Sequence, residues 1–179
     1  MDNFLILSVA GGRKTQGIIE HCAKYPSGRK AAILTFTKAN QDEIKKRIDR
    51  DLGDKVDINV LGWYSFLIRD FSRPFIPFKF IDSRVRGFNF DGRPHRMSTG
   101  KNRFLDSNGY IYACELSRLS YELISSSHGA LTHRLECIYD EILIDEVQDL
   151  SGHDWSIIDF LFNTNIDVRM VGDLSLIHI

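Results

Sequence analysis

The feature that most constrains this chain is an apolar run followed by a glycine-containing loop, a lysine and a threonine. Residues 4–9 read FLILSV and predict a buried strand, and the loop Ala10-Gly11-Gly12-Arg13 then leads into Lys14, Thr15 and apolar residues at helical spacing. This order presents backbone N–H groups at a helix N-terminus, which is where phosphates bind. The pattern therefore favours a phosphate-binding loop on an α/β scaffold.

The loop fits a phosphate site only in part. Lys14 stands where a lysine reaches the outer phosphates of a nucleotide, and Thr15 stands where a hydroxyl ligates magnesium. The strict pattern GxxxxGK[ST] has glycine where this chain has Ser8 and Arg13, and a Cβ at the second position obstructs the backbone approach to a phosphate. Taken alone, the loop fits a glycine turn that leads into a helix equally well.

Strands continue to alternate with helices along the chain. Apolar or β-forming runs predict strands at 31–37, 56–61, 138–144 and 167–171, and amphipathic spacing predicts helices at 40–52, 65–71, 111–125 and 155–162. Such alternation predicts a parallel sheet that is covered by helices on both faces. The expected fold class is therefore α/β.

The segment 72–110 interrupts this alternation. Three of the four prolines fall there, and phenylalanines alternate with basic residues, so we predict an inserted, loop-rich unit. The net charge of the chain is -1, but residues 67–110 carry nine Lys and Arg against four Asp and Glu, whereas residues 111–179 carry three against twelve. The basic segment suits contact with a polyanion; a solvated face, or a hydrophobic mini-core of the insertion, is the alternative.

Composition excludes several other classes of protein. The 43% hydrophobic and 26% charged residues are typical of a globular chain, and we find neither a signal peptide nor an apolar run that could span a bilayer. We therefore expect a cytoplasmic protein with no membrane partner. Cys22, Cys114 and Cys137 are too scattered for a disulfide framework and are expected to be buried thiols. The spacing of His128, His133 and Cys137 fits no zinc pattern.

A second group of chemical residues follows the strand predicted at 138–144. The sequence there is Asp145-Glu146-Val147-Gln148-Asp149. Parallel sheets bind ligands at the carboxyl ends of their strands, where one carboxylate can ligate magnesium and the next can accept a proton from an attacking water. An acidic turn that caps a strand is the structural alternative. The glycine loop in the same chain favours the catalytic interpretation.

These motifs resemble those of the UvrD/Rep-like superfamily 1 DNA helicases. DEVQD at 145–149 resembles the DExxQD motif of that family, and LTFTKAN at 34–40 resembles its TFTNKAA motif. LGWYSF at 61–66 resembles TFHSF, with Tyr64 in place of histidine, and MVGD at 170–173 resembles the opening of VGDxxQ. The matches follow the order of the family and cover nearly the whole chain outside the insertion.

The resemblance implies a RecA-like P-loop NTPase domain formed by residues 1–71 and 111–173, with 72–110 as an inserted subdomain and 174–179 as a tail of doubtful origin. ATP and Mg²⁺ would be its cofactors. The nucleotide would lie on Ala10, Gly11, Gly12, Arg13, Lys14 and Thr15, and the metal on Thr15 and Asp145. The catalytic residues would be Lys14, Glu146, which polarises the water, and Gln148, which senses the γ-phosphate. Single-stranded DNA would lie along Thr35, Phe36, Thr37, Lys38, Trp63 and Tyr64.

The implied activity is ATP-dependent translocation on single-stranded DNA, coupled to unwinding of duplex DNA. In the family, a second RecA-like domain supplies arginines to the γ-phosphate and an upstream glutamine motif reads adenine. Neither is found in these 179 residues, so we expect a coding sequence truncated near Asp173 and a fragment that is inactive alone. A catalytically degenerate P-loop DNA-binding module, favoured by Arg13, is the alternative. A small P-loop kinase is disfavoured, because DEVQD and the TFT segment have no role in one.

Overall fold

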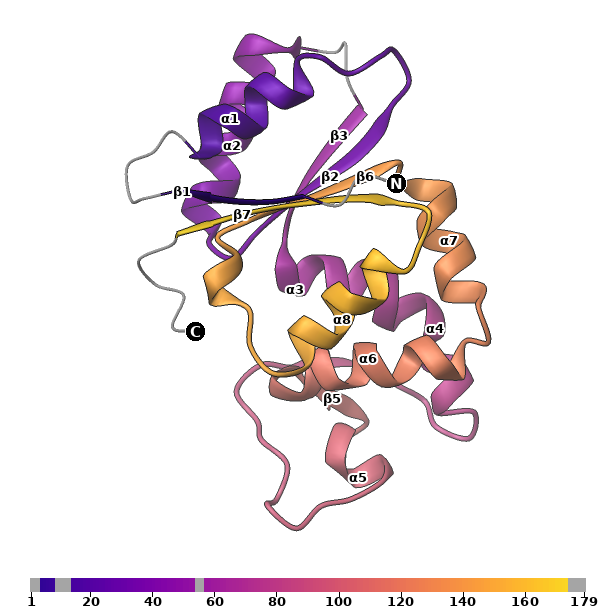
Figure 1. Ribbon diagram of the computed structural model, residues 1–179. Helices are drawn as coiled ribbons and strands as arrows, with labels where there is room; N and C mark the ends of the chain where they lie inside the picture. The colour runs from indigo at the N-terminus through magenta and orange to yellow at the C-terminus, as the bar shows by residue number, and fades with distance from the viewer. Residues whose placement is uncertain (1–3, 9–13, 54–56, 174–179) are drawn as a thin grey trace.

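The computed structural model describes residues 4–8, 14–53 and 57–173 (Figure 1). Within them, the central element is a five-stranded sheet in the order β1-β7-β6-β2-β3, and every neighbouring pair is parallel. The strands are β1 (Phe4–Ser8), β2 (Lys30–Thr35), β3 (Asp57–Gly62), β6 (Glu141–Asp145) and β7 (Asp167–Asp173). The α/β fold with a parallel sheet is thus confirmed.

Helices cover both faces of the sheet. α1 (Lys14–Cys22) and α2 (Lys38–Asp51) lie on one face, and α3 (Trp63–Phe66), α4 (Arg73–Lys79), α6 (Leu116–Ser126), α7 (Ala130–Ile138) and α8 (His153–Phe162) belong to the other side (Figure 1). Side chains that alternate along β2 divide the core in two. Ala31 and Ile33 pack with α1 and α2, whereas Ala32 and Leu34 pack with the helices opposite.

The segment predicted to be loop-rich from residue 72 begins with a helix. A π-helical turn over Leu67–Ser72 continues α3 directly into α4, despite Pro74 and Pro77. Pro74 lies in the first turn, where a backbone N–H needs no helical partner, and Phe75 and Ile76 are buried in the core. The rest of the segment contains a short helix, α5 (Lys101–Phe104), and β4 (Gly87–Asn89), which pairs with β5 (Tyr110–Tyr112).

Three further predictions are corrected. The helix predicted at 111–125 begins only at Leu116, after β5 and a 3-10 turn. Helix α7 was not predicted, and it contains Ile138, which we assigned to the following strand. Leu131 and Leu135, one turn apart on α7, are buried and hold the helix against the core. Of the three cysteines, Cys22 is buried, but Cys114 and Cys137 are exposed. Burial raises the pKa of Cys22 to about 11.

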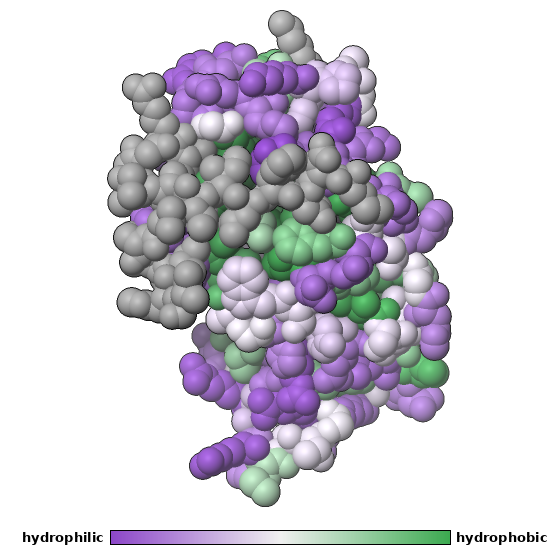
Figure 2. Space-filling model, viewed as in Figure 1, coloured by the Kyte–Doolittle hydropathy of each residue, from purple (hydrophilic) through white to green (hydrophobic). Residues whose placement is uncertain are grey.

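On the face drawn in Figure 2, hydrophilic side chains predominate toward both ends of the molecule, and hydrophobic ones show mainly across its middle. Each helix in the described part of the chain is too short or too polar to cross a membrane.

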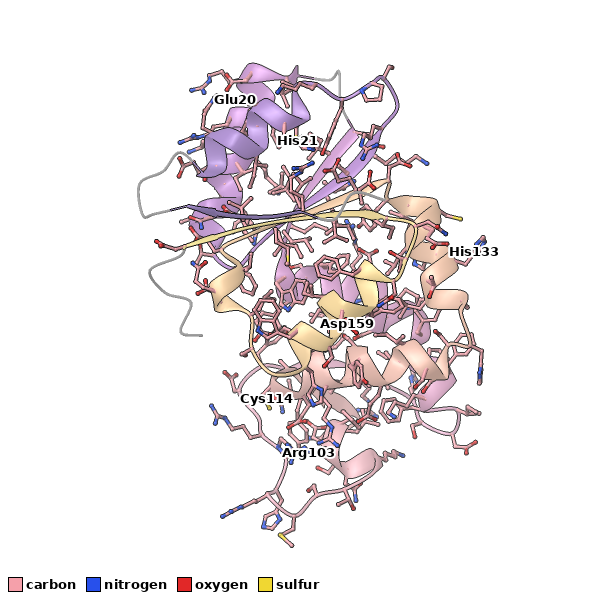
Figure 3. The ribbon with its side chains drawn as sticks, viewed as in Figure 1. Glu20, His21, Arg103, Cys114, His133 and Asp159 are labelled. Atoms are coloured by element: carbon pink, nitrogen blue, oxygen red, sulfur yellow. The ribbon has the colours of Figure 1, made fainter. Side chains whose placement is uncertain are left out.

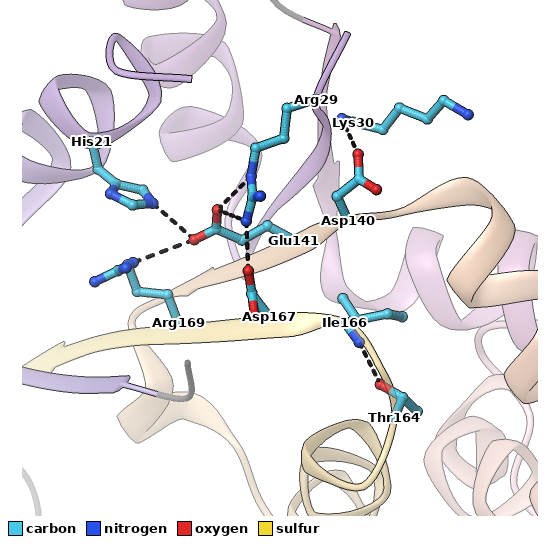
Figure 4. Close-up of polar contacts among 9 residues, drawn as sticks. All are labelled: His21, Arg29, Lys30, Asp140, Glu141, Thr164, Ile166, Asp167 and Arg169. Carbon is cyan, nitrogen blue, oxygen red and sulfur yellow. Dashed lines mark hydrogen bonds and ion pairs between the residues drawn. The ribbon is translucent and has the colours of Figure 1, made fainter. Parts of the chain in front are cut away.

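The amino ends of the strands are joined by a buried carboxylate, Glu141, at the start of β6. Figure 3 shows His21 on the side of α1 that faces the sheet, and its Nε2 lies 2.8 Å from Glu141 Oε1. Arg29 Nη2 donates to Glu141 at 2.9 Å and to Asp167 at 2.7 Å, and Arg169 donates to Glu141 at 3.4 Å (Figure 4). Burial alone would raise the pKa of Glu141, but the hydrogen bonds from His21 and Arg29 hold it below its usual value.

Candidate active site

The carboxyl ends of the five parallel strands form one edge of the sheet, and the predicted motifs gather there (Figure 1). β1 ends at Ser8, opposite Asp173 of β7, and β6 ends at Asp145, opposite Val171 of β7. Ala10, Gly11, Gly12 and Arg13 lie outside the described residues, so their contacts with a nucleotide stay predictions. Lys14 and Thr15 form the first turn of α1, and Thr15 is partly buried.

The acidic turn after β6 has an unusual backbone. Asp145 is buried, and its Oδ1 accepts a hydrogen bond from the Glu146 N–H at 3.1 Å. Glu146 adopts the left-handed conformation, with φ 58° and ψ 50°. This conformation costs a residue with a Cβ about 1–2 kcal/mol, and such outliers concentrate at functional sites. The turn ends the strand alternation and redirects the Glu146 side chain before a 3-10 turn at Val147–Asp149.

Gln148 connects the acidic turn to the end of β7. Its Nε2 donates to Glu146 Oε2 at 2.5 Å, and its Oε1 accepts a hydrogen bond from the Asp173 backbone N–H at 3.1 Å. Gly172 permits this approach, because a Cβ there would lie 3.2 Å from Gln148 Oε1. Asp173 is buried at the same edge. We did not predict it as a site residue, although the apolar strand that ends in Gly-Asp indicated its position.

The donor set at this edge fits a magnesium ion. A hydroxyl at Thr15 and a carboxylate at Asp145 are the hard oxygen ligands that Mg²⁺ prefers, and Mg²⁺ is usually held by one or two protein groups together with phosphates and water. Within the described ranges, no three His, Cys, Asp or Glu side chains are grouped so that they could hold a metal ion. This applies also to His133 and Cys137, which contact each other on α7 with 3.7 Å between Nε2 and Sγ.

The segment after β2 has the exposed residues expected of a binding surface. Thr37 caps α2, since its Oγ1 accepts a hydrogen bond from the Asn40 N–H at 3.2 Å. Thr35 is buried, and its hydroxyl donates to the Thr37 carbonyl at 3.3 Å. Thr37 and Lys38 are exposed, and Lys38 pairs with Asp42 at 2.8 Å. Thr37 and Lys38 can therefore reach a ligand, whereas Thr35 supports the turn from within.

Trp63 does not lie on the surface, where we expected it for direct contact with DNA. Its side chain is only 1% exposed, and the indole N–H donates to Asp154 Oδ1 at 2.8 Å. Phe36, which is partly buried, stacks against it with ring centroids 6.1 Å apart at an interplanar angle of 30°. Tyr64 is 53% exposed. Because α3 directs Trp63 into the core, the aromatic ring that this segment exposes to solvent is that of Tyr64.

Buried phenylalanines of the basic segment join the main core on the side of α6 and α8, instead of the separate small core that we gave as the structural alternative. Phe80 packs against Phe104 at 6.1 Å, and both are buried. Lys79 lies over the Phe104 ring and pairs with Glu122 at 2.6 Å. Phe90 remains exposed. Arg103, labelled in Figure 3, pairs with Glu115 at 2.7 Å.

Comparison with protein families matches residues 97–175 to the UvrD/REP helicase N-terminal domain. The matched stretch runs from the basic segment through α6, the acidic turn and β7. Comparison with curated proteins finds no match.

Proposed function

Residues 97–175 belong to the UvrD/REP helicase N-terminal domain, so the chain contains a helicase-family ATP-binding motor domain, and from this premise we propose its activity. The chain binds ATP at the carboxyl edge of the sheet, uses its hydrolysis to move along single-stranded DNA, and unwinds duplex DNA as part of the complete motor. The observation that supports the proposal is that Gln148 bonds both Glu146 of the acidic turn and Asp173 at the end of β7, and that β7 pairs there with the end of β1.

The chemistry proposed for this edge uses four residues, which are Glu146, Asp145, Thr15 and Lys14. Glu146 accepts the proton of the attacking water, because its carboxylate is held by the Gln148 amide and directed away from the strand. Asp145 and Thr15 would hold Mg²⁺, which would neutralise charge on the phosphates. Lys14, the first residue of α1, would reach the outer phosphates.

Gln148 is the residue that senses the nucleotide in this proposal. Its amide bonds both Glu146 and the backbone of Asp173, so a γ-phosphate that competes for the amide changes two contacts at once. The state of the nucleotide then alters the packing of the acidic turn against β7.

The nucleic-acid surface lies at the ends of β2 and β3. Thr37 and Lys38 contact the sugar-phosphate backbone, and the exposed ring of Tyr64 stacks on a base. Phe36 is partly buried and stacks on the buried ring of Trp63. The chemistry of aromatic rings beside a lysine suits unpaired bases, which is why we propose single-stranded DNA.

The decisive test is binding of a fluorescent ATP analogue with Mg²⁺ to the purified chain. Asp145→Asn should weaken binding, whereas Asp140→Asn, the same change at an exposed residue at the opposite edge of the sheet, should leave it unaltered. Equal affinity of the two variants would contradict the proposed site.

Arg13 favours one alternative function, a DNA-binding module that has lost catalysis. If the loop keeps its cradle, the guanidinium adds donors to the phosphates, and Arg13→Gly should bind nucleotide equally or more weakly. A large gain in nucleotide affinity for Arg13→Gly would mean that Arg13 is an obstruction, and the alternative would then hold.

A further inference from the structure

We propose that Asp154 is a positioning residue that transmits the state of the acidic turn to the aromatic residues at the ends of β2 and β3. The inference rests on the proposed function and adds to it a specific mechanical connection between the nucleotide site and the DNA surface.

Asp154 accepts hydrogen bonds on both of its carboxylate oxygens. The Trp63 indole N–H donates to Oδ1 at 2.8 Å, and the Ser151 backbone N–H donates to Oδ2 at 3.2 Å. The Asp154 backbone N–H in turn donates to the Ser151 carbonyl at 2.9 Å. The residue is 5% exposed, so bulk water cannot readily replace either donor. One carboxylate therefore ties Trp63 to Ser151, although the two lie far apart in the sequence.

Ser151 moves with the acidic turn because the backbone between them is held together. The Asp149 N–H donates to the Glu146 carbonyl at 3.0 Å, and the Leu150 N–H donates to the Val147 carbonyl at 3.1 Å. Val147 and Leu150 are both buried and anchor this segment in the core. A displacement of Glu146 is thus carried to Ser151 rather than absorbed by a loose loop.

On the other side, Trp63 supports the surface that we assign to DNA. Phe36 stacks on its ring, and Tyr64 follows it in the chain. If Asp154 shifts, Trp63 must move with it or lose its buried hydrogen bond. Either outcome changes the packing of Phe36 on the indole ring and the position of Tyr64. Nucleotide binding then changes the affinity for DNA, and DNA must change the affinity for nucleotide by the same factor.

The test measures the coupling ratio, which is the affinity of the full chain for fluorescein-labelled oligothymidylate with a nonhydrolysable ATP analogue and Mg²⁺, divided by the affinity without them. Couplings between two sites are commonly about 5–150-fold, and we expect the parent chain to fall in this range. Asp154→Asn replaces one acceptor oxygen by an N–H donor, and Trp63→Phe removes the indole N–H but keeps a ring. Both variants should bring the ratio to about one.

Asp159→Asn is the matched control, because it makes the same change at an exposed residue of the same helix, labelled in Figure 3. It should keep the coupling ratio of the parent. A purely structural role of Asp154 would lower both DNA affinities equally and leave the ratio intact, and this result would overturn the inference. If Asp154→Asn does not fold, Trp63→Phe alone decides.

The parent chain separates failure of the inference from failure of the proposed function. Binding of both ligands with a ratio of one would overturn the coupling and leave the function standing. Binding of neither ligand would overturn both.

Discussion

Substitution of Glu141 by glutamine tests the buried cluster that joins α1 to β6 and β7. The carboxylate is 2% exposed and accepts hydrogen bonds from His21, Arg29 and Arg169. Glutamine has nearly the same shape, but it carries no charge and directs N–H donors toward guanidinium donors. The substitution therefore removes the interaction without creating a cavity.

The expected loss of unfolding free energy is about 2–4 kcal/mol. Net contributions of hydrogen bonds to charged groups are about 1.5–3 kcal/mol each, and loss of one partner from a buried pair costs about 3–5 kcal/mol. The side chains of His21, Arg29 and Arg169 are 19–29% exposed, so water can hydrate them after the substitution and the cost falls below the sum. For a chain of this size, the melting temperature should decrease by about 5–15 °C.

The pH dependence supplies an independent check. Because the pKa of Glu141 is lowered in the folded state, its charge stabilises the fold above the pKa of the unfolded chain, and this stabilisation is lost as pH falls through the folded pKa. The difference between parent and variant should be largest near neutral pH and should shrink below about pH 4.

Urea unfolding followed by circular dichroism measures the unfolding free energy of each variant and, when it is repeated at several pH values, its pH dependence. The control is Asp140→Asn, because the exposed Asp140 accepts one hydrogen bond from the Lys30 N–H at 2.8 Å and asparagine can accept the same bond. It should change stability by less than about 0.5 kcal/mol. If Glu141→Gln is as stable as this control at neutral pH, the cluster does not hold the amino ends of the strands together.

Three other predictions concern the carboxyl edge. Tyr64→Ala should lower the affinity for single-stranded DNA by about 1–3 kcal/mol, and the slope of log affinity on log salt, about -3 for four phosphates, should stay unchanged in fluorescence anisotropy; an unaltered affinity would remove Tyr64 from the surface. Gly172→Ala should push the Gln148 amide away and accelerate hydrogen exchange of the Asp173 N–H, whose bond it now accepts at 3.1 Å; unchanged protection would refute the contact. The 179-residue polypeptide alone should hydrolyse ATP very slowly even with DNA, because the family's γ-phosphate arginines come from a second RecA-like domain, and such arginines contribute about 10³–10⁵ in rate. Rapid DNA-stimulated release of phosphate would show that no second domain is needed.

The central strands β2 and β6 could be predicted because both are buried on both faces and contain continuous apolar runs. Residues 142–144 are an example, and this run ends at Asp145 of the acidic motif. The gathering of Asp145, Gln148 and Asp173 then follows from parallel strands alone. The hydrogen bonds by which Gln148 joins Glu146 to Asp173 were not predicted and are seen only in the structure.

Other features depend on contacts that a linear pattern does not reveal. Pro74 and Pro77 indicated a loop, but the burial of Phe75 and Ile76 outweighs their low helix propensity. Trp63 is followed by the exposed Tyr64 and Ser65, but its indole is buried and donates to Asp154, which lies far along the chain. A pattern gives the residue type and spacing, but it does not give the partner of a buried donor.

The left-handed backbone at Glu146 means that this turn holds a carboxylate at the expense of backbone stability. Glycine at that position would relieve the strain of the Cβ and lower the free energy of the folded state by about 1 kcal/mol. Glycine would, however, also remove the carboxylate and its hydrogen bond with the Gln148 amide. The glutamate is therefore the less stable choice for the backbone and the choice that supplies a carboxylate beside the end of β6.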